Sequence, residues 1–108
     1  MKTSIPEEEY AILLKALRVE RELREITQVE LASRLGVEQT FVSKCERGGR
    51  RLDVLEFRKW CLALGTTVGE FMERVEVQLT TFEAAMAATL AAQKKIARKS
   101  KPSKKQSP

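Results

Sequence analysis

The 108-residue sequence predicts an all-α protein, and three observations support that class. Apolar side chains recur every three or four residues, most clearly over 10–23, as they do along one face of a helix. Three segments, 27–30, 53–56 and 67–70, pair a Thr or Asp with a Glu three positions later, which is the capping box that opens a helix. No convincing sheet pattern and no internal repeat accompany them.

Each predicted helix has its own start and stop signals. A proline and three glutamates suit the first turn of a helix over 6–23, where a missing N–H costs nothing and negative charge is stabilised. The first capping box opens a short helix over 27–35, which the next glycine ends. A third helix should cover 39–47, before a Gly-Gly pair. The second box opens a helix over 53–64, again followed by glycine, and the third opens a helix from 67 through 71.

The segment from 75 to 92 is ambiguous. Four apolar residues at steps of four, three and four make a seam like that of a coiled coil; they are Val75, Leu79, Phe82 and Met86. Residues 75–79 also alternate like a short strand, and 80–83 resemble the start of a new helix. We favour a helix with a break near Thr80 and Thr81, because no Gly or Pro interrupts 70–101.

The net charge of +5 conceals an uneven distribution. Residues 1–93 contain 13 Lys/Arg and 15 Asp/Glu, whereas 94–108 contain seven Lys/Arg and no acid. This pattern indicates a folded domain over 6–74, a C-terminal helical segment over 75–93, and a disordered basic tail over 94–108 that is attracted to a polyanion. The alternative is that the tail is simply solvated and aids solubility.

Composition argues against several function classes. The chain has no histidine, so the commonest general base and metal ligand is missing, and we expect no metal and no cofactor. Cys45 and Cys61 are expected to be small buried hydrophobes. The carboxylates are scattered and no nucleophile has a base beside it, so we expect no enzyme. Without a signal peptide or an apolar run of about 20 residues, the sequence predicts a cytoplasmic protein with no membrane contact.

The stretch 28–47 has the spacing of a helix-turn-helix. Ala32 falls where the two helices would cross, and Gly36 falls in the turn, where a positive φ costs glycine nothing. Apolar residues take the positions that face the core: Leu31, Leu35, Val37, Val42 and Cys45. Polar residues share the opposite face of the helix over 39–47, the second helix of this motif: Gln39, Thr40, Ser43 and Lys44. A helix with one anchored face and one hydrogen-bonding face suits a DNA major groove.

Residues 14–71 resemble the phage repressor and Cro-type (XRE) helix-turn-helix family. The resemblance is carried by TQVELASRLGV at 27–37, QTFVSKCERG at 39–48 and ALG at 63–65. It implies a five-helix Cro/repressor-like domain, here with an extra C-terminal helix and a disordered basic tail. It also implies a sequence-specific transcriptional regulator that binds double-stranded DNA, most simply a repressor.

The resemblance also implies roles for individual residues. The base-reading positions are Gln39, Thr40 and Lys44, with Ser43 beside them. The phosphate-binding positions are Gln28, Arg50 and Arg51, although solvated loop charges are the alternative for the two arginines. Arg21 and Glu46 match a structural salt bridge. Phe41 lies at the edge of the reading face, where it either contacts a thymine methyl or enters the core.

Three residues depart from the family pattern. Glu38 stands where a short polar N-cap is usual; it should cap poorly, or accept a hydrogen bond from cytosine N4. Glu25 replaces a common glycine, which implies a strained turn or a different one. Leu52 replaces a frequent proline and changes little.

One recognition helix spans few base pairs, so we expect a homodimer on two half-sites. The seam of Val75, Leu79, Phe82 and Met86, with Leu62, is the best candidate for the interface, because these side chains have no clear place in a five-helix core. An antitoxin whose C-terminal helix binds a partner protein is the alternative function, and loose nucleoid association led by the tail is a third.

Overall fold

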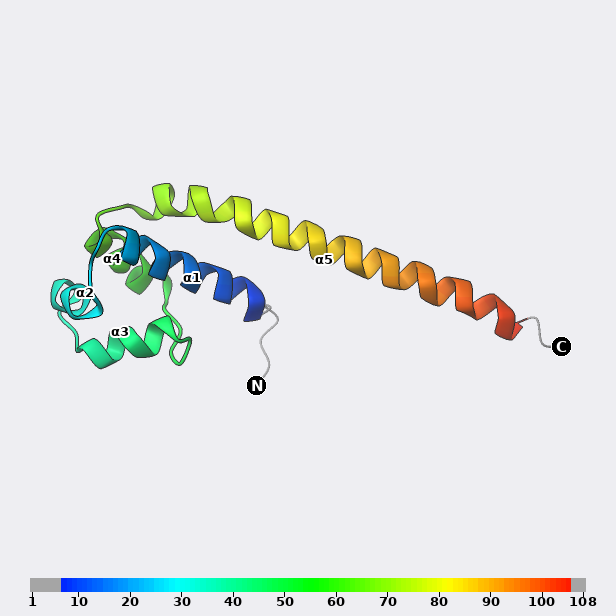
Figure 1. Ribbon diagram of the computed structural model, residues 1–108, viewed down its shortest axis with the longest axis horizontal. Helices are drawn as coiled ribbons and strands as arrows, with labels where there is room; N and C mark the ends of the chain where they lie inside the picture. The colour runs from blue at the N-terminus through cyan, green and yellow to red at the C-terminus, as the bar shows by residue number, and fades with distance from the viewer. Residues whose placement is uncertain (1–6, 106–108) are drawn as a thin grey trace. The chain divides into compact units, whose positions relative to one another are not determined.

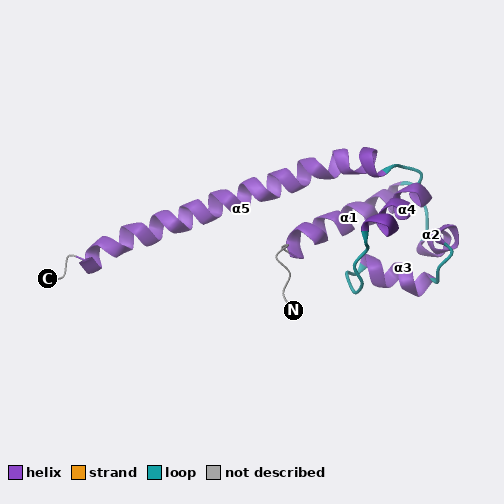
Figure 2. Cartoon of the chain, turned by 180° about the vertical axis from the view of Figure 1, so that it is seen from behind, coloured by secondary structure: helices purple, strands orange, loops and turns teal. Residues whose placement is uncertain are grey.

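Five helices follow one another along the chain (Figure 1). The computed structural model describes the backbone of residues 7–105 and the side chains of residues 7–96. The helices are α1 (Glu7–Leu23), α2 (Gln28–Leu35), α3 (Gln39–Glu46), α4 (Val54–Leu64) and α5 (Val68–Lys105). Over residues 7–105 there is no strand, as Figure 2 also shows, so the predicted all-α class is confirmed.

The chain divides into two compact units, Met1–Gln78 and Leu79–Pro108. The first unit contains α1 to α4 and the beginning of α5, and the second contains the rest of α5. No helix of the described residues is both long and apolar enough to span a membrane.

The core of the first unit lies between its helices. α2 packs against α3 and α4, and α1 packs against the same two helices. The buried apolar side chains come from all five helices and the turn after α1; they are Leu14, Leu17, Ile26, Leu31, Ala32, Val42, Cys45, Trp60, Cys61, Leu64, Phe71 and Val75. Both cysteines are free and buried, as predicted.

Only one of the three predicted capping boxes is complete. Asp53 accepts from the backbone N–H of Glu56, whose carboxylate accepts from the N–H of Asp53. At the N-terminus of α2, the Thr27 hydroxyl accepts from the N–H of Glu30 at 3.0 Å, but the Glu30 carboxylate binds Arg34 instead. At the N-terminus of α5, the N–H of Glu70 is likewise capped, while its carboxylate accepts from the hydroxyl of Thr66. A favourable side-chain partner nearby therefore competes with the reciprocal backbone bond.

The turns on either side of α2 each contain a residue with a positive φ. Gly36 ends α2 with a φ of +73°, as the sequence predicted, and Glu25 precedes α2 with a φ of +58°. The side chain of Glu25 disfavours this conformation, which costs a non-glycine residue about 1 kcal/mol. The turn between α1 and α2 therefore keeps the usual geometry, and the strain expected from replacing its glycine is present.

Ala32 is 3% exposed and lies on the α2 surface that packs against α3 and α4. Ala32→Leu should lower the free energy of unfolding by about 1–3 kcal/mol, because a core this small has little room for three more carbons. Ser33→Leu places the same side chain on the exposed neighbouring position and is the control. Urea unfolding of both variants measures the difference, and an unchanged midpoint for Ala32→Leu would show that the helix crossing has spare volume.

The structure corrects two expectations about the region after residue 74. Val75 is 1% exposed and belongs to the core of the first unit, so it is not available to a dimer seam. α5 has no break at Thr80 and Thr81, no strand at 75–79, and no separate sixth helix. Its first turn is capped, and the alanine-rich stretch that follows has high helix propensity.

α5 also continues to Lys105, through most of the segment for which a disordered tail was expected. Lysines and arginines near a helix C-terminus are stabilised by the helix dipole, which favours helix there. Residues 106–108 of the predicted tail lie outside the described residues.

Candidate nucleic-acid interface

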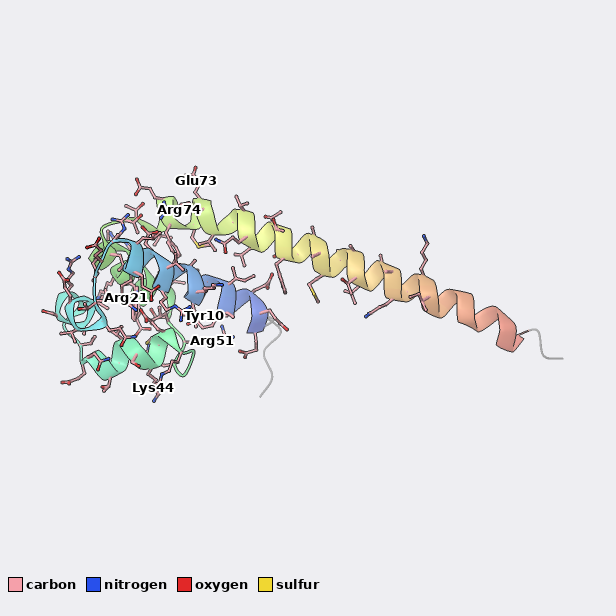
Figure 3. The ribbon with its side chains drawn as sticks, viewed as in Figure 1. Tyr10, Arg21, Lys44, Arg51, Glu73 and Arg74 are labelled. Atoms are coloured by element: carbon pink, nitrogen blue, oxygen red, sulfur yellow. The ribbon has the colours of Figure 1, made fainter. Side chains whose placement is uncertain are left out.

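α3 has one buried face and one exposed face. Val42 and Cys45 are completely buried against the rest of the domain. Gln39, Thr40 and Lys44 are exposed, and Ser43 is half-buried beside them. Figure 3 shows Lys44 on the side of α3 that faces away from α1. The four residues predicted to read bases therefore share one surface of one helix.

A buried salt bridge ties α1 to the end of α3. The Nε of Arg21 donates to Oε2 of Glu46 at 2.6 Å, and its Nη2 donates to Oε1 at 3.0 Å. The two side chains are only 10% and 5% exposed. Arg21 also donates to the carbonyl of Ile26 at 2.9 Å, which holds the turn before α2. The ion pair implied by the family resemblance is therefore present, and the bond to Glu46 raises the pKa of Arg21 above its ordinary value.

The salt bridge extends through two glutamines to the start of α3. Nε2 of Gln28 donates to Oε1 of Glu46 at 2.8 Å, and Nε2 of Gln39 donates to Oε1 of Gln28 at 2.7 Å. We refer to Arg21, Glu46, Gln28 and Gln39 as the relay. Sequence reasoning placed Gln28 on a phosphate and did not foresee these bonds, because the residues are 11 and 18 positions apart in the chain.

The relay fixes which way each amide faces. A carboxylate only accepts hydrogen bonds, so Gln28 must turn its NH₂ group to Glu46 and its oxygen to Gln39. Gln39 must then turn its NH₂ group to Gln28. One N–H of Gln39 is thereby used, while its carbonyl oxygen and second N–H have no partner within the described part of the domain. An amide oxygen and an amide N–H are the pair that binds N6 and N7 of adenine.

The two arginines after α3 are both held by the domain. Arg50 binds Glu56 at 2.9 Å, and its guanidinium lies over the ring of Phe41, 5.0 Å from the ring centre. The contact with Glu56 raises the pKa of Arg50, and Arg50 in turn lowers the pKa of Glu56. The guanidinium of Arg51 lies over the ring of Tyr10, 4.2 Å from the ring centre. Figure 3 labels both side chains. Arg51 also has a carboxylate partner, Glu7 at 3.9 Å, but this contact is longer than the 2.9 Å contact of Arg50 with Glu56, so Arg51 is the stronger candidate for a phosphate.

The positions of Phe41 and Glu38 bear on the alternatives expected for each of them. Phe41 is half-buried, and its ring centre lies 6.5 Å from that of Trp60, so it belongs to the core edge more than to the reading face. Glu38 is the N-cap of α3, and its side chain makes no capping hydrogen bond. The predicted poor cap is confirmed.

The fold and this surface define a helix-turn-helix DNA-binding domain. A helix-turn-helix family model matches residues 14–71, which is more than half of the chain. The chain therefore belongs to the XRE-type helix-turn-helix family of DNA-binding transcriptional regulators, and the boundaries of the match are those that the sequence motifs indicated.

Solved structures agree with this assignment. An XRE-family like protein from Pseudomonas syringae pv. tomato is 43% identical with a TM-score of 0.63, and the match covers 67% of this chain and 88% of that one. The clp gene regulator ClgR from Corynebacterium glutamicum is 28% identical with a TM-score of 0.59, over 83% and 87% of the two chains. A second ClgR structure is 27% identical with a TM-score of 0.58, over 72% and 99%. No curated protein matches the chain significantly.

Proposed function

We propose that the protein is a sequence-specific repressor that reads the DNA major groove with α3. The observation that carries this proposal is the orientation of Gln39, whose free carbonyl oxygen and N–H suit an adenine. Lys44, on the same surface, suits O6 and N7 of guanine. Thr40 and Ser43 lie beside them. Occupation of a promoter by such a domain would block transcription.

Phosphate contacts would position the reading helix. Arg51 stands in the loop after α3, and its guanidinium is exposed above Tyr10. Arg50 and Gln28 are the further candidates at this surface. Gln28 would act on two sides, because its second amide N–H can donate to a phosphate while the first holds Glu46. Contacts to phosphate fix register but carry no sequence information.

A homodimer would bring two reading helices to one operator. Of the predicted seam, Leu79 and Phe82 are half-buried and Met86 is 45% exposed, so these three remain candidates for the interface. Leu62 is 48% exposed on α4. Two half-sites would lie about 34 Å apart or a multiple of that distance, which is one turn of DNA.

Substitutions on the reading surface test the proposal. Selection from a random DNA pool first yields the preferred operator. Gln39→Ala and Lys44→Ala should then each weaken operator binding by about 1–3 kcal/mol and relax the preference at one base pair. Arg51→Ala should weaken binding to all sequences alike and flatten the salt dependence by about one unit of slope. Fluorescence anisotropy with operator and scrambled DNA at several salt concentrations separates the two effects.

Arg58→Ala is the matched control, because Arg58 is an exposed arginine on α4, outside the helix-turn-helix. It should leave operator preference unchanged. Equal losses on operator and scrambled DNA for Gln39→Ala and Lys44→Ala would contradict the assignment of α3 as the reading helix.

A further inference from the structure

The second unit shows no core within its described side chains. Over residues 79–96 of α5 no side chain is buried. Met86 is 45% exposed and Leu90 57%, and these follow Leu79 and Phe82 at steps that place all four on one face of the helix. Helices in proteins owe most of their stability to packing of an apolar face. This face is therefore expected to meet a partner.

Charge is sorted along α5. Residues 68–83 hold four glutamates and one arginine, and Arg74 is already paired with Glu20 at 2.8 Å. Residues 84–93 hold no charge, and six of them are alanines. Residues 94–105 hold seven basic residues and no acid. The helix is thus acidic at one end, neutral in the middle and basic at the other.

We propose that α5 pairs with α5 of a second copy in antiparallel orientation. This inference rests on the homodimer of the proposed function and specifies its interface. Only the antiparallel orientation sets the acidic end of each helix against the basic end of the other. A parallel pair would set seven basic residues against seven. The neutral, alanine-rich middle would let the two backbones approach closely, because alanine adds little bulk between them.

The neutral, alanine-rich middle of α5 sets the centre of the pair. A centre between Ala87 and Ala88 places position 79 of one copy opposite position 96 of the other, and Phe82 opposite Gln93. The same register places Glu76 opposite position 99 of the partner, within a basic stretch. The seven basic charges outnumber the acidic ones, so the pair keeps an excess of positive charge at each end.

Cross-linking of single-cysteine variants tests the orientation. Leu79→Cys and Ile96→Cys are made separately in the full-length chain, in which Cys45 and Cys61 are completely buried and the unsubstituted chain is the control. In the antiparallel pair the two equivalent thiols, one on each chain, are about 25 Å apart, since they are separated by 17 residues that rise 1.5 Å each. We expect a short bismaleimide to link neither variant alone and to link an equimolar mixture of the two. Met86→Cys, near the centre, should link to itself.

The cross-linking outcomes decide the proposal. Linking of Leu79→Cys to itself would show a parallel pair and overturn it. A chain that stays unlinked in every combination, Met86→Cys included, would also overturn it and leave the helix for another protein. Because operator binding is measured separately, a monomer that still prefers its half-site would refute this inference and not the DNA-binding function.

Charge reversal supplies a second, independent measurement. E76K/E83K and K95E/K99E should each weaken self-association in sedimentation without DNA by about tenfold, and an equimolar mixture should restore it. In a parallel pair K95E/K99E would instead strengthen self-association. If the variants change DNA affinity and leave self-association unchanged, the basic segment serves DNA and the antiparallel pairing is wrong.

Discussion

Replacing Arg21 with alanine is expected to lower the free energy of unfolding by about 3–5 kcal/mol, because it leaves the Glu46 carboxylate buried without its counter-charge. Glu46 is only 5% exposed, so its carboxylate would be left with little solvation. The carbonyl of Ile26 also loses a buried donor. A loss of this size would remove much of the stability of a domain this small. Urea unfolding followed by circular dichroism gives the difference directly.

Glu30→Gln is the matched control for the ion pair. It breaks the contact of Glu30 with Arg34, whose side chains are 49% and 42% exposed. Exposed pairs contribute only about 0–1 kcal/mol, so this variant should unfold close to the original. If Arg21→Ala costs no more than Glu30→Gln, the relay does not hold α1 to α3.

Trp60→Ala should lower the free energy of unfolding by a similar amount, about 3–5 kcal/mol. Trp60 is 2% exposed and is one of the largest buried side chains of the domain. Its ring packs near Phe41 on α3, so the substitution opens a cavity beside the reading helix. Urea unfolding measures the loss, and the operator preference of the folded fraction should persist because Phe41 lies outside the proposed base contacts.

Trp60→Phe separates volume from polarity. The indole N–H of Trp60 is buried and has no hydrogen-bond partner among the described residues. An unsatisfied buried donor costs about 1–3 kcal/mol, so its removal should offset part of the volume lost on changing to phenylalanine. We expect Trp60→Phe to be much milder than Trp60→Ala. Equal losses for the two variants would indicate that the indole N–H is satisfied, for example by a bound water.

The first unit was largely predictable because its signals are local. Gly36 and Gly65 end α2 and α4 where the sequence indicated, and each helix begins within one residue of its predicted start. Of the positions expected to face the core, Leu31, Val42 and Cys45 are buried, whereas Leu35 is half-buried and Val37 is 37% exposed, so the prediction for Val37 was wrong. Helix periodicity, caps and glycines act over a few residues and can be read without knowing the fold.

Features that depend on packing between distant segments escaped prediction. Val75 looked like part of an exposed seam, because nothing in its neighbourhood shows that the first turns of α5 close the core. The bonds among Gln28, Glu46 and Gln39 arise only when α2 and α3 cross. The Glu30 and Glu70 carboxylates, which were predicted to cap a backbone N–H, instead accept hydrogen bonds from the side chains of Arg34 and Thr66. Local sequence preferences predict where the helices form, whereas the packing of the helices against one another determines the contacts of each side chain.

The two buried thiols make the stability of the domain depend on pH in the alkaline range. Burial raises the pKa of Cys45, and it raises the pKa of Cys61 from 9.0 to about 11. With no histidine in the chain, no side chain has an ordinary pKa between about 5 and 8. The folded state holds its thiol protons more tightly than the unfolded chain does, so their contribution to stability is complete below pH 9 and is lost as the pH rises toward 11. Stability is therefore expected to fall at alkaline pH, where deprotonation of the two thiols would place negative charge in the core of the domain.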